Sequence, residues 1–328
     1  MPPGPAATGK SAYRRMQVVS KPSELKCCGG KLAATLGMFD GVHLGHQQII
    51  QHALADARQV GGSALVITFD RHPETVVAPA RAPLLIQPLW HKLRAFESLG
   101  VQYVWLIEFN YEFSRIRGED FIRNLVSDIG GLYSICVGAD FVFGHGQSGN
   151  LQLLKTLGAE LGFAVRGIGP VLVDGQPVSS TRIRKAISEG DFATAGRLLG
   201  RPYALAGCVI RGQGLGRTIG FPTANLDTAG LVLPPNGVYA ARARLRARTY
   251  PAAVNVGYRP TVSSAQQTRT VEAYLLDATG DFYGEQIELE FVCKLRDEVA
   301  FPSLQALQCQ IAADVNAVRK IFSSAATA

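Results

Sequence analysis

The sequence predicts two consecutive domains of different class: an α/β domain whose parallel sheet is covered by helices on both faces, then an antiparallel β-barrel with a terminal helix. In the first half, apolar strand-like runs alternate with amphipathic helix-like runs, a pattern typical of a parallel sheet. Beyond residue 201, short runs alternate apolar and polar residues between turn signals such as Pro234-Pro235-Asn236-Gly237, which favours a closed barrel. A chain of 328 residues has room for both domains.

The elements of each half follow from these patterns. Apolar runs in the first half predict strands over residues 32–36, 64–69, 103–107, 135–137 and 163–165. Apolar residues at helical spacing predict helices over residues 47–58, 89–99, 118–128 and 151–161, and a linker helix over 188–200. In the second half we expect strands over residues 204–210, 237–245, 252–256, 270–276 and 286–292. The last helix is expected over residues 303–322, with Ser303 as its N-cap.

The composition narrows the class of protein. Hydrophobic residues make up 47% of the chain, yet no apolar run approaches the roughly 20 residues of a membrane span, so we expect no membrane partner. The Pro/Gly/Ala-rich segment 1–16 is expected to be a disordered tail and not a secretory signal. Six cysteines without C-x-x-C spacing favour a reducing cytoplasm. The net charge of +7 suits ligands that bear phosphates, and because the basic residues are scattered we expect no nucleic-acid partner. Weak self-association stays open.

The most informative stretch is Gly37-Met38-Phe39-Asp40-Gly41-Val42-His43-Leu44-Gly45-His46. It follows a predicted buried strand and precedes a predicted helix. A glycine-rich turn at that place leaves backbone N–H groups and the positive end of the helix dipole facing an anion. Two imidazoles in the same turn indicate chemistry on a phosphate as well as binding. The alternatives are a loop whose histidines only bind backbone, and a zinc site, for which the i, i+4 spacing is missing.

A second glycine-rich segment, Arg211 to Asn225, lies in the barrel half. Its glycines allow the backbone to approach a phosphate chain closely. Thr223 and Asn225 are two residues apart, so on an extended chain their side-chain oxygens point the same way. Hard oxygens beside a phosphate loop suit Mg²⁺. The alternative is a glycine-rich hairpin that ends at a proline.

Both segments resemble signatures of one enzyme family, the bacterial bifunctional riboflavin kinases/FAD synthetases. The first resembles G-x-F-D-G-x-H-x-G-H, and the second resembles G-x-G-x-G-R-x-x-G-[FY]-P-T-A-N. Other segments that resemble the family are Thr68–Pro73, Gly138–Gly144, Ser179–Arg184, Asn236–Tyr239, Asn255–Gly257, Arg259–Thr261 and Val271–Glu272. The resemblance implies a Rossmann-like FMN adenylyltransferase domain over residues 17–187 and a riboflavin kinase domain over residues 201–325. The substrates it implies are riboflavin, FMN and ATP, with FAD as the final product.

For adenylyl transfer, the resemblance implies that the phosphate of FMN attacks the α-phosphate of ATP. His43 and His46 are expected to hold the oxygens of that phosphate. The residues expected to bind the rest of ATP are Gly37, Phe39, Asp40, Gly41, Ser180, Thr181 and Arg184. Asp140 and Phe141 are expected on the flavin side. The alternative for the segment Ser179–Arg184 is a cap and a charged pair at the start of a surface helix.

For the kinase step, the 5′-hydroxyl of riboflavin attacks the γ-phosphate of ATP, and a carboxylate should accept its proton. Composition does not choose among the acidic residues of this half. The resemblance selects Glu272, whose alternative is an ordinary carboxylate on a strand surface. It also implies ATP contacts at Gly212, Gly214, Gly216 and Arg217, Mg²⁺ contacts at Thr223 and Asn225, and a flavin contact at Asn255.

The chain departs from the family pattern at Arg71, Val142 and Gln147. The family usually has Pro at the first position and often Arg at the other two, so residues 144–150 are less basic than usual. We predict weaker binding of FMN or ATP in the adenylylating half, with activity retained. Two rival interpretations stay open: a kinase whose adenylylating half has decayed, and a flavin-sensing regulator or RNA-binding protein.

Overall fold

The computed structural model describes residues 15–28, 30–212, 214–258 and 269–324. They form two compact units, each built from separated stretches of the chain. The sheet unit contains the residues up to 38, then 47–80 and 93–169, and the barrel unit contains 39–46, 81–92 and the residues from 170 onwards. Residues 1–14 of the predicted tail and the segment Arg259–Thr261 lie outside the described residues.

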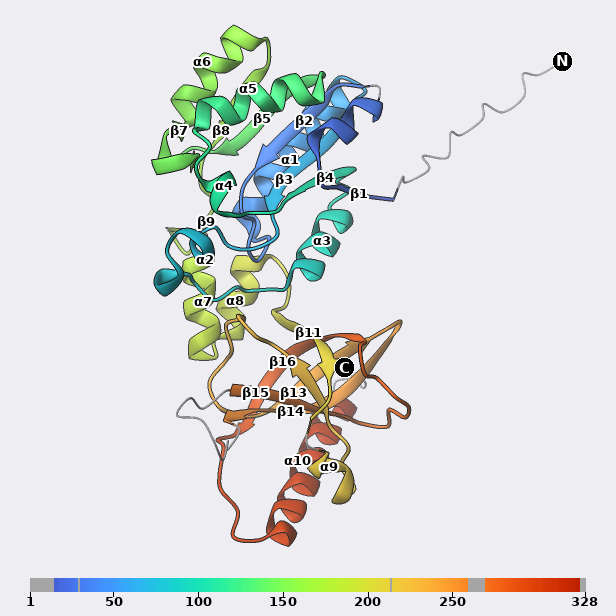
Figure 1. The fold of residues 1–328 in the computed structure, drawn as a ribbon. Coiled ribbons are helices and arrows are strands. Elements are labelled where there is room, and N and C mark those ends of the chain that lie inside the picture. The colour runs from blue at the N-terminus through green and yellow to red at the C-terminus, as the bar shows by residue number, and fades with distance from the viewer. Residues whose placement is uncertain (1–14, 29, 213, 259–268, 325–328) are drawn as a thin grey trace, which may run out of the picture. The chain divides into compact units, whose positions relative to one another are not determined.

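The sheet unit is built on a six-stranded sheet in the order β1-β4-β3-β2-β5-β8 (Figure 1). Its strands are β1 (Gln17–Val19), β2 (Leu32–Leu36), β3 (Ser63–Phe69), β4 (Tyr103–Ile107), β5 (Leu132–Gly138) and β8 (Ala164–Ile168). The longer helices are α1 (Leu44–Gln59), α3 (Leu89–Ser98), α5 (Gly118–Ile129) and α6 (Leu151–Leu161). The short elements are α2 (Glu74–Val77), α4 (Tyr111–Ser114), β6 (Val142–Phe143) and β7 (Gly149–Asn150). All pairings in the large sheet are parallel, which confirms the predicted class.

Helices cover both faces of this sheet. On one face, strand residues such as Leu36 belong to one hydrophobic cluster with Ile122 of α5 and Leu154 of α6. On the other face, α1 lies over β5, where the Cys136 thiol donates to the Asp56 carboxylate at 3.7 Å. Covered faces explain why the strands read as continuous apolar runs in the sequence.

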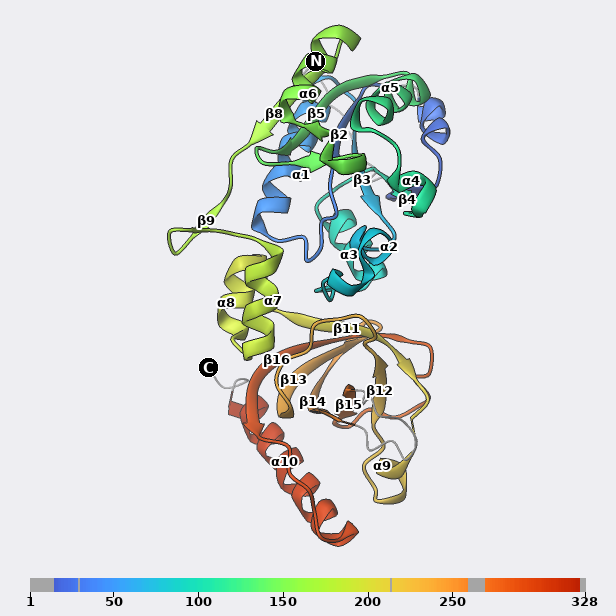
Figure 2. The same ribbon diagram turned by 60° about the vertical axis from the view of Figure 1, so that its left-hand side comes forward.

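The barrel unit is built on a closed antiparallel barrel in the order β11-β12-β15-β14-β13-β16 (Figure 2). Its strands are β11 (Ala204–Ile210), β12 (Ala224–Asp227), β13 (Gly237–Leu245), β14 (Arg248–Tyr258), β15 (Arg269–Leu275) and β16 (Gln286–Arg296). Its helices are α7 (Ser180–Glu189), α8 (Phe192–Leu199), α9 (Leu215–Thr218) and α10 (Leu304–Ser324). A small hairpin of β9 (Leu172–Val173) and β10 (Gln176–Pro177) precedes α7.

One hydrophobic cluster fills the barrel and continues into the helix pair. Leu205 and Leu289 lie inside the barrel, and the same cluster contains Ile187 of α7 and Leu199 of α8. A second cluster places Val318 of α10 against the outer face of the barrel. The predicted barrel and terminal helix are therefore confirmed.

Among the elements that differ from the sequence-based expectation are α1, the linker helix and β12. Helix α1 begins at Leu44 and not at residue 47, so His46 lies in its first turn. The helix expected over 188–200 is two helices, because Gly190, with φ of 77°, ends α7 and the Asp191 side chain accepts from the Thr194 N–H at 2.9 Å to cap α8. Strand β12 was not predicted as a strand, because its four residues are too few to show an alternating pattern. In the described part of the chain, no helix combines the length and apolar character needed to cross a membrane.

Candidate active sites

The turn after β2 has an unusual backbone. Phe39, Gly41 and Val42 have positive φ values of 54°, 83° and 42°, a region that costs free energy for residues with a side chain. At Gly41 a Cβ atom would also lie 2.9 Å from Ile86 Cδ1, so a larger residue would be strained by its φ and would have to displace the end of the Ile86 side chain. The N–H of Gly37, predicted to face ATP, donates to the Ile67 carbonyl at 3.1 Å. This N–H is therefore bonded within the sheet unit and does not point to a ligand.

This turn brings the two predicted histidines together. Their rings stack with centroids 3.6 Å apart and planes 17° apart, and the edge of Phe39 contacts the His46 ring at 5.2 Å. The His46 N–H donates to His43 Nδ1 at 3.3 Å. Because that nitrogen accepts a hydrogen bond, the proton of neutral His43 lies on Nε2. His43 is thereby oriented as a hydrogen-bond donor.

Both imidazoles are neutral at physiological pH. Burial, assisted by the positive charges of Arg201 and Arg184, lowers the pKa of His43 from 6.5 to about 4. Burial also holds the pKa of His46 well below its ordinary value, with smaller contributions from His43 and Lys92. A neutral imidazole next to cations can donate an N–H to an anion without first losing a salt-bridge partner.

Asp40 is a support of the turn. The residue is 2% exposed, and its carboxylate accepts from the Ile86 N–H at 3.0 Å and from Arg184 Nη2 at 2.8 Å. Burial raises the pKa of Asp40 against the opposing charge of Arg184. The Ser180 hydroxyl donates to the Asp40 carbonyl at 2.9 Å, and Arg184 Nε donates to the Leu84 carbonyl at 2.7 Å. The start of α7 is thus bonded directly to the histidine turn.

The remaining residues predicted for adenylyl transfer lie on exposed segments. Thr181 is exposed in the first turn of α7, next to Ser179, whose hydroxyl accepts from the Arg182 N–H at 3.3 Å and caps the helix. In the sheet unit, Asp140 is exposed just beyond β5. Phe141 stacks on Phe143 with ring centroids 5.5 Å apart.

The predicted kinase residues converge on one face of the barrel. Glu272 of β15 lies between two asparagines in the strand register, Asn225 of β12 and Asn255 of β14. The Thr223 hydroxyl donates to Glu272 Oε2 at 3.2 Å. Because its neighbour Val271 points into the barrel core, alternation along the strand places Glu272 on the outer face.

The glycine loop lies against this cluster. A Cβ atom on Gly212 would be 2.2 Å from Asn225 Nδ2, so the loop backbone touches the asparagine only because a glycine stands there. Gly214, with φ of 75°, opens the single turn of α9. Gly216 packs on the Phe221 carbonyl, and Arg217 is exposed. Gly212, Gly216, Thr223, Asn225 and Glu272 therefore lie close together.

Sequence reasoning missed three polar residues beside the histidine turn, two of them buried. Gln87 and Lys92 are only 4% and 3% exposed. The Arg201 guanidinium donates to the Gly41 carbonyl at 2.8 Å and to Gln87 Oε1 at 3.2 Å. Nothing local in the sequence marks any of these three residues.

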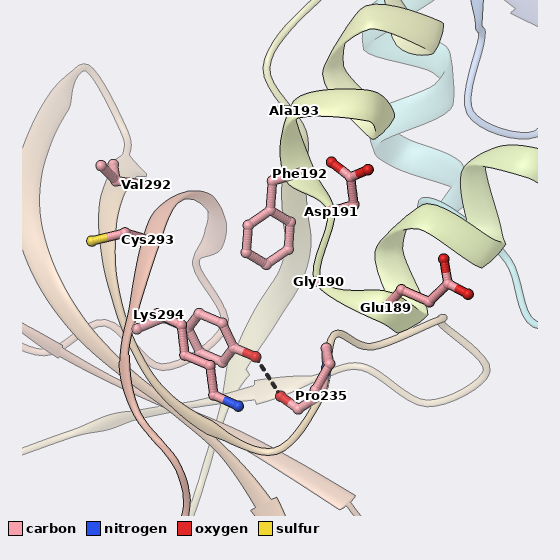
Figure 3. A pocket seen from close by; sticks show the side chains of 10 residues that line it. Glu189, Gly190, Asp191, Phe192, Ala193, Pro235, Val292, Cys293 and Lys294 are labelled. Atoms are coloured by element: carbon pink, nitrogen blue, oxygen red, sulfur yellow. Dashed lines mark hydrogen bonds between the residues drawn. The ribbon is translucent and has the colours of Figure 1, made fainter.

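A separate pocket of about 330 Å³ opens between the α7–α8 turn and the barrel (Figure 3). Phe192 lies on its helix side, Cys293 and Lys294 lie on its strand side, and the Tyr239 hydroxyl donates to the Pro235 carbonyl at 2.6 Å. None of its lining residues was predicted as a site residue. It is separate from the histidine turn and from the polar residues around Glu272.

The histidine turn that follows a parallel strand and the glycine loop on the barrel are features of a two-domain protein that binds nucleotides. A family model described as FAD synthetase matches residues 27–182, and one described as riboflavin kinase matches residues 199–322. The chain belongs to the family of bifunctional riboflavin kinases/FMN adenylyltransferases.

Two relatives of that name match over nearly their whole length, and a solved structure of another description matches the fold. The bifunctional riboflavin kinase/FMN adenylyltransferase of Escherichia coli strain K12 is 37% identical over 88% of this chain and 92% of its own. The protein of that name from Buchnera aphidicola subsp. Acyrthosiphon pisum is 35% identical over 94% of this chain and 99% of its own. A crystal structure described as a macrolide-efflux protein from Streptococcus pneumoniae has a TM-score of 0.77 at 28% identity, and covers 93% of this chain and 99% of its own.

Proposed function

We propose that this chain makes FMN from riboflavin and then FAD from FMN, with ATP as the co-substrate of both steps. The C-terminal half phosphorylates riboflavin, and the N-terminal half adenylylates FMN and releases pyrophosphate. The observation that carries the proposal is that the chain contains both family regions in succession, at residues 27–182 and 199–322.

In adenylyl transfer, an oxygen of the FMN phosphate forms a bond to the α-phosphorus of ATP. The bond from that phosphorus to the bridging oxygen breaks, and pyrophosphate leaves with the electron pair. Negative charge grows on the non-bridging oxygens, and donors already in place lower the barrier without reorganising. His43 Nε2–H and the stacked His46 ring are these donors in our proposal, because both are neutral and held by the turn.

The β- and γ-phosphates lie at the start of α7 in this proposal. Support comes from the exposed Thr181 and from the positive end of the helix. Arg184 binds the same phosphates with guanidinium N–H groups other than those bonded to Asp40 and Leu84. Ser180, whose hydroxyl donates to the Asp40 carbonyl, binds them with its backbone N–H at the start of the helix. Asp40 contributes by holding Arg184 in place.

In the kinase step, the 5′-hydroxyl oxygen of riboflavin forms a bond to the γ-phosphorus of ATP while the bond to the departing ADP oxygen breaks. Glu272 accepts the hydroxyl proton. Its contact with Thr223 and its place between Asn225 and Asn255 support this role. Gly212, Gly214, Gly216 and Arg217 hold the ATP phosphates, and Asn255 contacts the flavin.

The donor set at the kinase cluster fits Mg²⁺, because the hydroxyl of Thr223 just before β12, the amide of Asn225 and the carboxylate of Glu272 on the adjacent strand are all hard oxygen ligands. Thr223 and Asn225 would hold the ion, which when bound neutralises charge on the β- and γ-phosphates. This fit also explains why an asparagine, rather than an apolar residue, lies under the glycine loop.

The outer limits of the two halves and the setting of the enzyme belong to the same proposal. We assign residues 17–187 to adenylyl transfer, 188–200 to the linker and 201–325 to the kinase, in a cytoplasmic enzyme. Asp140 and Phe141 contact the flavin in the first half. The charge missing at Val142 and Gln147, both exposed, weakens FMN or ATP binding there.

The proposal is tested by incubating the full chain with riboflavin, ATP and Mg²⁺ and separating FMN from FAD by chromatography. His46→Ala should stop at FMN, and Glu272→Gln should lose FMN formation yet still make FAD from supplied FMN. His52→Ala on the exposed side of α1 and Glu290→Gln on β16 are the matched controls, and both should keep both steps. If either active-site variant loses both steps while folded, the division of labour is wrong.

A further inference from the structure

Arg201 connects the second family region to the histidine turn. It follows Gly200, the residue that ends α8, and lies just before β11. Its Nη2 donates to the Gly41 carbonyl at 2.8 Å and its Nη1 donates to the Val42 carbonyl at 3.2 Å. The remaining acceptors are the Leu199 carbonyl at 3.4 Å and Gln87 Oε1 at 3.2 Å. All four acceptors are uncharged groups of the protein.

These bonds act on the peptide units that carry His43. The Val42 carbonyl belongs to the peptide whose N–H is that of His43, so a donor on this oxygen limits rotation of the plane that precedes the histidine. Gly41 and Val42 both have positive φ, and such a backbone persists only where its surroundings hold it. The planar guanidinium binds two successive carbonyls at once, a geometry that a lysine ammonium does not reproduce.

The same side chain brings a positive charge next to the imidazole. Burial lowers the pKa of Arg201, opposed by Glu288, and the charge of Arg201 contributes to the low pKa of His43. The other charged or titratable groups around the two histidines are Arg184 of α7, Lys92 of α3 and Asp40 of the turn.

We infer that Arg201 is a positioning residue for adenylyl transfer, although it lies in the stretch that matches the riboflavin kinase model. It holds the carbonyls before His43 and so aims the Nε2–H at the α-phosphate. This inference rests on the proposed function of the histidine turn. Both Nη groups of the guanidinium donate their hydrogen bonds to the protein and so hold the turn without binding ATP. Removal of the guanidinium should therefore lower kcat for FAD formation more than it raises KM for ATP.

The test compares Arg201→Lys and Arg201→Met with Arg197→Met in the full chain. Arg197 is an exposed arginine one turn earlier, bonded to Asp174 at 3.0 Å. Both Arg201 variants should lower kcat for FAD formation from FMN by about 10- to 100-fold, the size expected for a small misplacement of a catalytic group. Their FMN formation from riboflavin, and both rates of the Arg197 variant, should stay within about 2-fold of the unmodified chain, as for a surface substitution.

A histidine NMR titration separates the effect of the positive charge of Arg201 from the effect of its hydrogen bonds to the turn. The pH midpoint of the His43 titration should rise in Arg201→Met, which removes the positive charge. It should stay low in Arg201→Lys, because lysine keeps the charge although it loses the paired N–H donors. A folded Arg201→Lys chain with unreduced kcat for FAD formation overturns the inference, as does an equal loss of both activities. If the unmodified chain makes no FAD at all, the proposed function fails. An unchanged titration midpoint of His43 in Arg201→Met would show, whatever the activity, that Arg201 does not lie next to His43.

Discussion

Replacing His43 by glutamine is expected to make the barrel unit less sensitive to acid. Burial lowers the pKa of His43 from 6.5 to about 4, so the unfolded chain binds this proton more tightly than the folded chain does. The folded state therefore keeps its full stability above pH 6.5 and loses stability as the pH falls towards 4. Glutamine removes the titrating ring and keeps a polar side chain.

The size of the effect follows from the two pKa values. At a pH of about 5 the unfolded histidine is almost fully protonated and the folded one almost fully neutral, which lowers the free energy of unfolding by about 2 kcal/mol relative to a pH of about 8. In stronger acid the loss levels off at about 3 kcal/mol, since one pKa unit corresponds to about 1.4 kcal/mol. His46 adds to the loss in the same direction because burial lowers its pKa too.

Fluorescence can follow the barrel unit separately, because the chain has two tryptophans, Trp90 in the barrel unit and Trp105 in the sheet unit. In a Trp105→Phe background, urea unfolding near pH 8 and pH 5 gives the free energy of unfolding around Trp90, with His43 and with His43→Gln. The chain with His43 should lose about 2 kcal/mol more than the variant. Equal losses would mean that His43 titrates normally in the folded chain, and the argument for a neutral donor would fail.

Three further substitutions test other parts of the structure. Gly41→Ala should lower FAD formation much more than the kinase rate, because it strains the histidine turn and displaces the end of the Ile86 side chain, whereas Gly100→Ala, which also has positive φ but nothing within 4 Å of its Cβ, should preserve both; equal FAD rates in the two variants would contradict this role of the turn. Gln147→Arg should tighten FMN binding, measured by equilibrium titration, and an unchanged affinity would remove the argument from the missing charge. Ser303→Ala should lower the free energy of urea unfolding by about 1 kcal/mol, because its hydroxyl caps α10 at 3.1 Å from the Ala306 nitrogen; no change would mean that water replaces the cap.

Local patterns in the sequence predict the elements well where a single period dominates. The strands over 32–36, 103–107, 204–210 and 237–245 and the helix over 151–161 have the predicted bounds. Each is an uninterrupted apolar or alternating run between turn residues, so its limits are set locally. Gly190 and Asp191 were equally local signals, and reading them as a helix end and a new cap would have divided the linker helix correctly.

The supports of the site were beyond sequence reasoning, because they join residues that are far apart in the chain. Arg201 binds the carbonyl of Gly41 across 160 positions, and Arg184 binds Asp40 across 144. Hydrophobic periodicity and local propensity do not indicate which distant residues form such pairs. Glu272 is similar, since only the register of three barrel strands sets its asparagine neighbours.

The adenylylation motif and the kinase barrel share one hydrophobic core. The cluster that includes Leu205 inside the barrel also includes Leu199 of α8 and Ile86, and Leu44 of the motif packs against it. Residues 39–46 are correspondingly packed in the barrel unit, although the strand before them belongs to the sheet unit. Substitutions that loosen the barrel core should therefore lower both activities. A loss of FAD formation assigns a residue to adenylyl transfer only when the kinase rate of the same variant is preserved, and this is the comparison on which the test of Arg201 depends.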